Sequence, residues 1–455
     1  TTDNNSYSHN YGVESYLARI NYGFKSRYYI DASWRTDGSS RFHPSDRWGH
    51  FWSVGASWRI SEEQFMENTR QWLDNLTLKV SYGVQGNDNL GTYYAWQGLY
   101  DYTWPNATDA GAFVDKLENR KVTWEKNGNL NAGIEATMFG GRLGVSVEYY
   151  NRKTRDMLLN SPLPISTGFT GFNDNVGSLR NQGLEVSLRG TILDKRDFRW
   201  DATLMGSFNR NKVLSLTGGQ DVITSGIRVI EVGRPIYTFY LPKTAGVDPA
   251  TGKQLYYAYW TQTVNDEGAL VNTRCDEYIT DNVAMATLSK YYHESREPKL
   301  FGSIGSTFTI LKNIDVSFLT TYSIGGWVYD GLYNGSMYVQ YAGNNWHKNA
   351  KRRWQKPGDK TDVPMLEVGG SYATASNSLI DASYFAIKNI TVGYTLPKRW
   401  LKKIDIESLR IYATLDNIAM FNHMDGMDPQ YNFTGSVAYS YTPSRVIAFG
   451  IDLNF

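Results

Sequence analysis

Histidine is a frequent general base and the commonest metal ligand, so its spacing is the first test for a catalytic site. The chain of 455 residues has six histidines: His9, His43, His50, His293, His347 and His423. None of them forms an HExxH motif or another close ligand spacing. The glycine clusters at 168–172 and 302–306 match neither a phosphate loop nor a nucleophile elbow. The sequence therefore predicts no enzymatic activity, no metal site and no cofactor.

Aspartates in two loop segments could still offer oxygen ligands to Ca²⁺. The segments are GFNDN at 171–175 and DGMD at 425–428. Asp and Asn side chains in loops also hydrogen-bond to the backbone two residues further on and so stabilise turns. We interpret both segments as turn-capping sequences rather than as calcium sites.

Two loop segments are unusually aromatic: YYAW at 93–96 and LYDYTWPN at 99–106. Flat aromatic rings stack on sugars, and Trp or Tyr anchors also dominate protein interfaces. Trp96 and Trp104 are therefore candidate contacts for a ligand or a partner protein, although packing between long loops would use the same residues. The basic run at 351–360 is interpreted as a solvated surface or one that faces lipopolysaccharide.

A different group of polar residues alternates with apolar ones along the chain. The charged members that we expect to face a common interior are Lys79, Glu135, Glu148, Glu185 and Arg189. Leu78 and Val80, for example, flank Lys79. A period of two predicts a β-strand with one apolar and one polar face. If the apolar face meets lipid, these five side chains line a polar lumen.

Composition is compatible with that interpretation. The 46 basic and 45 acidic residues nearly cancel, so nothing favours a nucleic-acid partner. The single cysteine, Cys275, excludes an intrachain disulfide framework. Mean hydropathy is −0.45, and no stretch has the roughly 18 consecutive apolar residues of a membrane helix. A barrel strand needs only about 9–11 residues of alternating character.

The alternating pattern recurs thirteen times. The predicted strands are 16–24, 28–36, 52–60, 76–83, 129–138, 143–151, 183–190, 198–209, 300–310, 314–322, 384–396, 409–418 and 446–455. No segment has the pattern of a long amphipathic helix. A short helix is expected within 61–73, with Ser61 as its N-terminal cap.

The connections between these strands alternate between short and long. The long ones are 37–51, 84–128, 152–182, 210–299, 323–383 and 419–445. Outer-membrane barrels have short periplasmic turns and long outer loops. The predicted fold is therefore an all-β, transmembrane, antiparallel β-barrel with its long loops outside the cell. A soluble β-sandwich is the alternative, but aromatic residues near the strand ends fit interfacial girdles better.

The strand count adds a parity argument. If the last strand runs towards the periplasm, so does the first, and residues 1–15 belong to an outer loop. Bacterial barrels usually have an even number of strands. Thirteen strands that start outside and end inside therefore require an odd number before residue 1. We expect residues 1–455 to be the C-terminal portion of a larger barrel, without its plug.

Several segments also resemble a known family. They include RYYIDASWRTDGSSRF (27–42), FWSVGASWRISEEQF (51–65), LTLKVSYGVQGND (76–88), WEKNGNLNAGIE (124–135), NVGSLRNQGLEVSL (175–188) and YTPSRVIAFGIDLNF (441–455). Together they resemble the SusC/RagA group of TonB-dependent outer-membrane transporters of Bacteroidota. The similar segments extend from about residue 16 to residue 455.

The resemblance implies a plugged barrel of about 22 strands. It implies import of oligosaccharides or peptides, energised by TonB–ExbB–ExbD, with a SusD-like surface lipoprotein as partner. It further implies a dimer of transporter–lipoprotein pairs. Two alternatives remain open at this point: a passive porin-type channel, and a surface adhesin or scaffold barrel.

Overall fold

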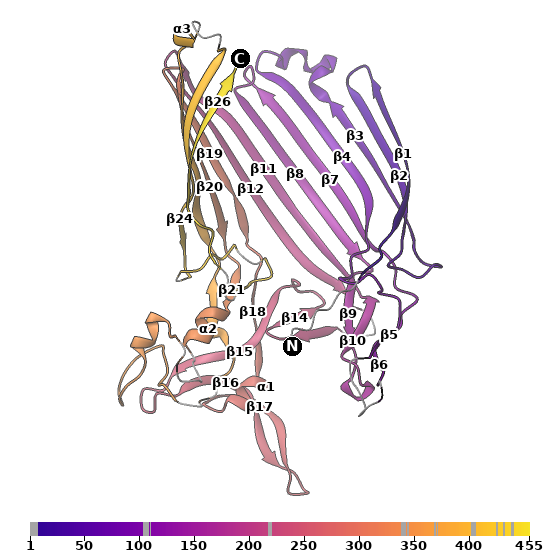
Figure 1. Ribbon diagram of the computed structural model, residues 1–455, viewed down its shortest axis with the longest axis vertical. Coiled ribbons are helices and arrows are strands. Elements are labelled where there is room, and N and C mark those ends of the chain that lie inside the picture. The colour runs from indigo at the N-terminus through magenta and orange to yellow at the C-terminus, as the bar shows by residue number, and fades with distance from the viewer. Residues whose placement is uncertain are drawn as a thin grey trace. The chain divides into compact units, whose positions relative to one another are not determined.

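The computed structural model describes residues 8–102, 109, 111–216, 221–337, 343, 345–367, 370, 372–401, 406–424, 426–430, 433–437 and 441–455. Its main element is an antiparallel sheet of thirteen strands (Figure 1). In spatial order they are β1 (Val13–Phe24), β2 (Tyr28–Ser39), β3 (Trp48–Arg59), β4 (Leu73–Asn87), β7 (Glu125–Met138), β8 (Leu143–Arg155), β11 (Ser178–Lys195), β12 (Phe198–Ser215), β19 (Leu300–Ile310), β20 (Ile314–Ile324), β23 (Tyr384–Thr395), β24 (Ser408–Asn422) and β26 (Val446–Asn454). Each corresponds to one predicted strand, and the predicted fold class is confirmed.

Most strands are longer than the alternating pattern predicted. The predicted strand 183–190 lies within β11, which begins at Ser178 opposite Arg155 of β8. Backbone hydrogen bonds continue there although, apart from Leu179, the side chains from Ser178 to Gln182 are polar. Periodicity detects only the part of a strand whose two faces differ, so it underestimates length.

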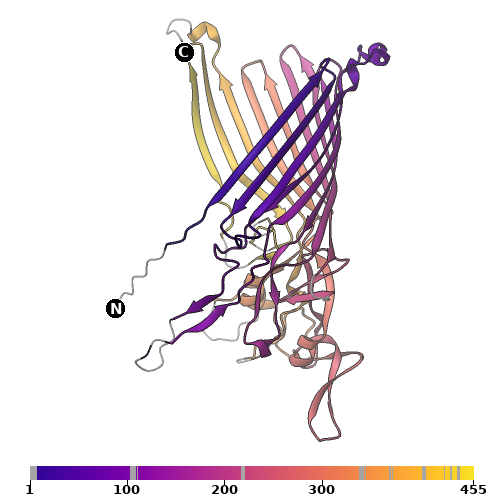
Figure 2. The same cartoon turned by 90° about the vertical axis from the view of Figure 1, so that its right-hand side faces the viewer.

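The short connections fix the register of neighbouring strands. Lys25 and Ser26 between β1 and β2 both have positive φ, at 49° and 53°. Leu311 and Lys312 between β19 and β20 repeat this conformation, at 51° and 63°. Two consecutive residues with positive φ make the type I′ turn, whose twist matches that of antiparallel strands. These turns lie at one end of the strands and the long connections at the other (Figure 1 and Figure 2).

The predicted helix within 61–73 is replaced by two 3₁₀ segments, η1 (Ile60–Glu62) and η2 (Gln64–Thr69). Ser61 is not a cap: it lies buried inside η1, and no side chain caps either segment. Glu63, which lies between the two 3₁₀ segments, connects them to the strands: its carboxylate accepts hydrogen bonds from Tyr28 and Trp58. The predicted cap at Ser61 was therefore wrong, and Glu63 bonds to side chains of the strands instead of to the start of a helix.

The chain folds as two compact units. Unit 1 comprises Thr1–Thr191, Asn209–Ile223 and Glu231–Arg234, and unit 2 comprises Ile192–Phe208, Thr224–Ile230 and Pro235–Phe455. Buried apolar clusters in both units lie mainly in the long connections. In unit 1, Phe42, Ala95, Val122 and Trp124 pack together with Phe51 of β3.

The long connections contain short elements that the sequence prediction missed. They are β5 (Leu99–Asp101), β6 (Phe113–Lys116), β9 (Leu158–Pro162), η3 (Ile165–Thr167), β10 (Gly171–Asn175), β13 (Val222–Ser225), β14 (Arg228–Glu231), β15 (Thr238–Val247), β16 (Gln254–Val264), β17 (Leu270–Thr280), α1 (Val283–Leu288), β18 (Lys290–Ser295), β21 (Trp327–Asp330), α2 (Gly331–Met337), η4 (Lys348–Arg352), η5 (Ser376–Ser378), β22 (Leu379–Asp381) and β25 (Ser436–Val437). The turn after β23 holds α3 (Lys398–Leu401). Within the described part of the chain, no helix is both long and apolar enough to cross a membrane.

These loop elements in unit 2 form their own small cores. Phe239 and Leu241 of β15 pack against Tyr329 of β21 and Leu379 of β22. Tyr256 of β16 is almost fully buried beside α1, and burial raises its pKa to about 12. The unit 2 parts of the connections 210–299 and 323–383 are thus packed against each other rather than being independent loops.

The sheet itself has the opposite distribution of apolar side chains. Ile20 is 71% exposed, Ile30 53% and Phe449 82%, although all lie within strands. Apolar side chains left on the surface over so many neighbouring strands would be unfavourable in water and are expected where a surface meets lipid. The sheet therefore requires an apolar medium against one face.

Candidate functional site

The register of unit 1 brings the predicted lumenal residues to one face of the sheet. Lys79 of β4 lies opposite Gly133 of β7, which lies opposite Glu148 of β8. Glu148 in turn lies opposite Glu185 of β11. Residues directly opposite each other in an antiparallel ladder point to the same face. Lys79, Glu148 and Glu185 therefore share a face, on a single row across the strands.

The other two predicted residues lie on that face as well. Glu135 is two positions beyond Gly133, and Arg189 is four positions beyond Glu185. Even spacing along a strand keeps a side chain on the same side. We name this side of the strands β1–β4, β7, β8 and β11 the polar face.

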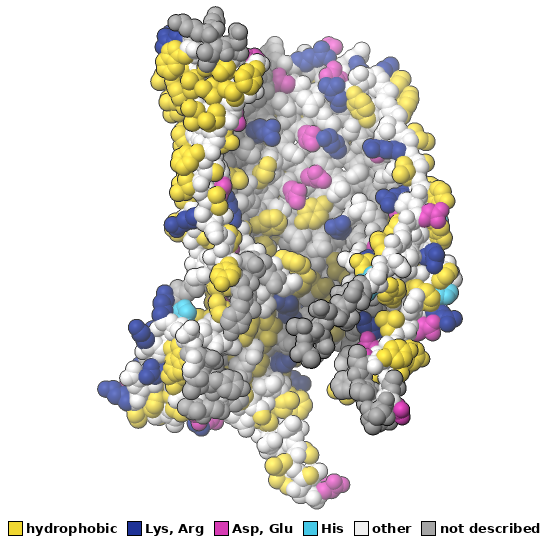
Figure 3. All heavy atoms as spheres, viewed as in Figure 1, with side chains coloured by type: hydrophobic (Ala, Val, Ile, Leu, Met, Phe, Trp, Pro, Cys, Tyr) yellow, Lys and Arg dark blue, Asp and Glu magenta, His cyan; other side chains and the backbone are white. Residues whose placement is uncertain are grey.

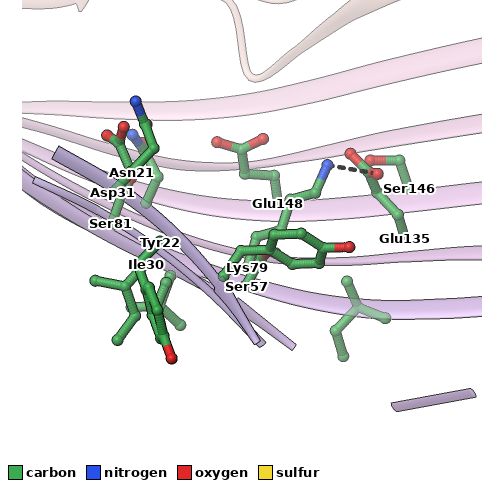
Figure 4. Close-up of a pocket in the computed structure, with 18 residues that line it drawn as sticks. Asn21, Tyr22, Ile30, Asp31, Ser57, Lys79, Ser81, Glu135, Ser146 and Glu148 are labelled. Atoms are coloured by element: carbon green, nitrogen blue, oxygen red, sulfur yellow. Dashed lines mark ion pairs between the residues drawn. The ribbon is translucent and has the colours of Figure 1, made fainter. Parts of the chain in front are cut away.

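Ion pairs are the main electrostatic feature of the polar face. Lys79 Nζ lies 2.6 Å from Glu135 Oε2, and both side chains are about half exposed (Figure 4). Arg19 and Asp31 form a second pair at 2.8 Å. Such exposed pairs hold charges in a defined place but contribute little to stability.

Glu148 and Glu185 are different, because two carboxylates lie directly opposite each other. Like charges in such positions are destabilising unless a cation or solvent compensates. Among the described residues, neither carboxylate forms a salt bridge within 4.0 Å. The polar face thus combines one paired acid, Glu135, with two acids, Glu148 and Glu185, that are open to an external partner.

A hollow of about 590 Å³ lies along these rows. Its lining includes small and polar residues of the polar face, namely Gly55, Ser57, Ser81, Gly133, Ser146, Asn21, Asp31 and Asn131, and also the apolar-side residues Tyr22, Ile30, Val80 and Ile134 (Figure 4). A Cβ on Gly133 would come within 3.1 Å of the Val147 carbonyl oxygen, so glycine keeps the surface low there. Figure 3 shows charged side chains scattered among such small residues over the sheet. The surface offers hydrogen bonds and charge, suited to a polar solute or polypeptide.

In unit 2, the strands hold a charge network that the sequence analysis missed. Arg410 of β24 binds Asp315 of β20 at 2.7 Å and Asp452 of β26 at 3.2 Å. One guanidinium therefore links three strands. Each residue alternates with an apolar neighbour, such as Ile411 beside Arg410, so the same periodicity could have identified it.

In unit 1, aromatic side chains lie on the apolar side of the strands, opposite the polar face. Trp34 and Trp52 are directly opposite each other in β2 and β3. The Trp58 ring stacks on Tyr28 near the short turns, with ring centroids 6.4 Å apart. Trp58 and Tyr28 lie near strand ends, as expected for interfacial aromatic rings. Trp34 and Trp52 lie further inside the strands than predicted, because β2 continues to Ser39 and β3 begins at Trp48.

Trp96 does not belong to the polar face. Its side chain packs against the unit 1 loop cluster, and its ring meets the His43 ring edge-on at 5.0 Å. This contact is the loop packing that the sequence analysis weighed against ligand binding. Contact with a ligand stays a prediction for Trp96, and Trp104 lies outside the described residues.

The possible calcium segments also have structural contacts of their own. In β10, the Asp174 carboxylate accepts hydrogen bonds from Asn119 Nδ2 and from the Asn175 backbone. In the second segment, Asp428 accepts from the Gln430 backbone, whereas Asp425 lies outside the described residues. Within the described ranges, no three or more His, Cys, Asp or Glu residues form a group that could hold a metal.

The antiparallel sheet with one polar and one apolar face defines an outer-membrane β-barrel protein. A family model described as "TonB dependent receptor-like, beta-barrel" matches residues 1–418. The chain belongs to this family. Within the family it is of the SusC/RagA type, as the sequence segments predicted. Outer-membrane location and the absence of an enzymatic role are confirmed by this membership.

Individual relatives agree over nearly the whole chain. TonB-dependent receptor P26 of Formosa agariphila is 29% identical over 97% of this chain and 46% of its own length. SusC of Bacteroides thetaiotaomicron is 29% identical over 97% of this chain and 43% of its own length. A structure of the RagAB peptide transporter matches with a TM-score of 0.84 and 29% identity, over 98% of this chain and 48% of that chain. The chain thus spans about half the length of these relatives.

Proposed function

We propose that these strands form the C-terminal portion of the barrel of an active nutrient importer, with the polar face lining its lumen. The observation that supports this most directly is the separation of the two faces. Ion pairs, hydroxyls and small residues occupy one side, and large exposed apolar residues occupy the other. An Arg or Lys side chain that faced lipid would cost about 2–4 kcal/mol near the midplane, and an Asp or Glu somewhat less.

The energy source and partners follow from the SusC/RagA type. We infer that uptake is driven by the TonB–ExbB–ExbD system and that a SusD-like surface lipoprotein binds the long loops, in dimers of such pairs. The long loops near 84–128, 152–182, 210–299, 323–383 and 419–445 are assigned to the outside. The solute is an oligosaccharide or a peptide: RagAB is described as a peptide transporter, and both solute classes suit a polar lumen.

The lumenal assignment can be tested by thiol labelling in the full-length protein. Cys275, the single cysteine of residues 1–455, and any cysteine elsewhere in the full-length protein are first replaced by Ser. Cysteines at Lys79, Glu135 or Glu148 should react with a membrane-impermeant reagent in the open barrel. Cysteines at Leu78 and Ile134 serve as matched controls on the opposite face and should stay unlabelled. Equal labelling of both sets would contradict the assignment.

Import is tested by deleting the gene and measuring the uptake of labelled oligosaccharides and peptides. An active importer loses uptake on deletion and also when the proton gradient is collapsed. Uptake that survives loss of the gradient would identify a porin-type channel. Unchanged uptake together with loss of surface attachment would identify an adhesin or scaffold.

A further inference from the structure

Arg152 lies on the polar face of unit 1, four positions beyond Glu148 along β8. Even spacing keeps the two side chains on the same side of the strand. Arg152 is exposed and lies three positions before Arg155, where β8 ends and a long connection begins. In the orientation proposed above, Arg152 is therefore close to the end of the barrel by which a solute enters.

Other cations of the polar face have acidic partners. Arg19 pairs with Asp31 at 2.8 Å, and Lys79 pairs with Glu135 at 2.6 Å. Among the described residues, no carboxylate lies within 4.0 Å of the Arg152 guanidinium, and no hydrogen-bond acceptor contacts it. All five N–H donors of its guanidinium are thus available to an external acceptor.

The ladder neighbours of Arg152 are two carboxamides. Arg152 lies opposite Asn129 of β7 and opposite Asn181 of β11. The Asn181 Oδ1 atom accepts a hydrogen bond from Asn211 Nδ2 at 2.8 Å, and the Asn181 amide hydrogens have no acceptor among the described residues. Asn129 has no hydrogen-bonding partner there either. The row therefore presents one guanidinium between two amide groups that can donate, with no acid of its own.

The nearest acids of the polar face on β8 and β11 lie towards the short-turn end. Glu148 is four positions from Arg152, and Glu185 is four positions from Asn181. Four residues of a strand span about 13 Å. A negatively charged group that enters from the long-loop end would meet Arg152 first, and the two acids would repel it further along.

We propose that Arg152, flanked by Asn129 and Asn181, binds a carboxylate group of the imported solute. A guanidinium pairs with both oxygens of a carboxylate, and amide hydrogens can occupy the remaining lone pairs. This chemistry is shared by peptides with a free C-terminus or an acidic side chain and by oligosaccharides that contain uronic acid. The inference rests on the proposed import function and adds to it a preference for a negatively charged solute.

The preference is tested by isothermal titration calorimetry on the full-length protein, purified in mild detergent together with any bound partner. The acidic probes are N-acetyl-tetra-alanine and tetragalacturonate. Their neutral counterparts are the C-terminal amide of the same peptide and the methyl ester of the same oligosaccharide. At least one acidic probe should bind about tenfold more tightly than its neutral counterpart, the effect expected for charge-assisted hydrogen bonds that water partly screens.

Arg152→Gln should lower the affinity for the acidic probe about tenfold and leave the affinity for the neutral one unchanged. Lys153→Gln is the matched control, because Lys153 is the next residue of β8, carries the same charge and lies on the opposite side of the sheet, facing Arg180. Arg152→Lys keeps the charge but loses the planar fork, so it should give an intermediate affinity. This second variant keeps the test valid if Arg152→Gln does not fold, as judged by heat-modifiable migration in gels.

Dependence on Arg152 with either acidic probe supports the carboxylate site and identifies which class of solute carries the group. Equal affinity for acidic and neutral forms, no binding of either acidic probe, or equal loss in Lys153→Gln would overturn it. Failed uptake by a protein that still binds the acidic probes would contradict only the import function. Active uptake by a protein that does not distinguish acidic from neutral probes would contradict only the carboxylate site.

Discussion

At the scale of single residues, adjacent positions in these strands experience opposite environments. Ile134 and Glu135 are neighbours in β7, yet Ile134 lies on the apolar side and Glu135 pairs with Lys79 on the polar face. Ile134 is 49% exposed, which no soluble core would leave on a central strand. The effect of a substitution on stability should therefore depend on which face of the sheet the residue occupies, even for residues adjacent in the sequence.

Ile134→Arg should destabilise the barrel by about 2–4 kcal/mol if this position is near the midplane of the bilayer. The reason is the cost of placing a guanidinium in hydrocarbon. The free energy of unfolding is measured by urea titration of the full-length protein in lipid vesicles. Ser146→Arg is the control, since Ser146 lies opposite Glu135 on the polar face. A larger loss for the control would reverse the assignment of faces.

A second prediction at the scale of single residues concerns the strength of the Lys79–Glu135 ion pair. Both side chains are about half exposed, so water or a wet lumen should screen their attraction. A double-mutant cycle with Lys79→Met and Glu135→Gln should give a coupling free energy of only about 0.2–1 kcal/mol. A coupling several times larger would mean that the pair is shielded from water, for example by a tightly bound plug.

At the scale of elements, the two kinds of connection have different structures. The hairpin of β16 and β17 ends in the turn 265–268, where the Asn265 side chain accepts a hydrogen bond from the Ala269 backbone. The turn at 139–141 joins β7 and β8 at the short-turn end, and its three residues all have positive φ. Both turns are largely exposed. The turn at 265–268 lies in a long connection, and the turn at 139–141 is a short connection.

Epitope tags should distinguish the two ends of the strands. A tag inserted at 265–268 of the full-length protein should be detected by antibody on intact cells, because the long connections are assigned to the outside. A tag at 139–141 should be detected only after permeabilisation. The opposite result would invert the topology while leaving the strands unchanged.

At the scale of the whole molecule, the strand order has two ends, β1 and β26. In hydrocarbon each unpaired backbone group costs several kcal/mol, so a membrane sheet must be closed by pairing its end strands. Closure of thirteen strands on themselves would require changes in register that the turns and the alternation of faces oppose. We therefore expect further strands to complete this barrel.

Residues 1–455 expressed alone should not yield a stable monomeric pore in lipid vesicles. The measurements are heat-modifiable migration in gels and single-channel conductance. Coexpression with a segment that supplies the remaining strands and a plug should restore folding. A heat-modifiable, conducting barrel made from residues 1–455 alone would contradict both the strand count and the parity argument.

The local features of this protein can be predicted from its sequence. Thirteen strands, their apolar and polar faces and the alternation of short and long connections follow from side-chain periodicity and turn residues, which act over a few positions. The face of Lys79 or Glu185 could therefore be predicted without knowing its neighbours. The strand ends could not, because polar stretches such as the start of β11 are ordered only by their pairing partner.

Contacts between residues far apart in the sequence are visible only in the folded chain. Arg410 binds Asp315, 95 positions away, and Gly206 of β12 lies opposite Gly302 of β19. Trp96 lies in a loop cluster because Phe42 and Trp124 converge there from separate connections. Such contacts depend on register and on the packing of long loops, where many arrangements satisfy the same local pattern. The alternation of apolar and polar residues predicts to which face a side chain points. Which residue it contacts depends on the pairing and register of all the strands.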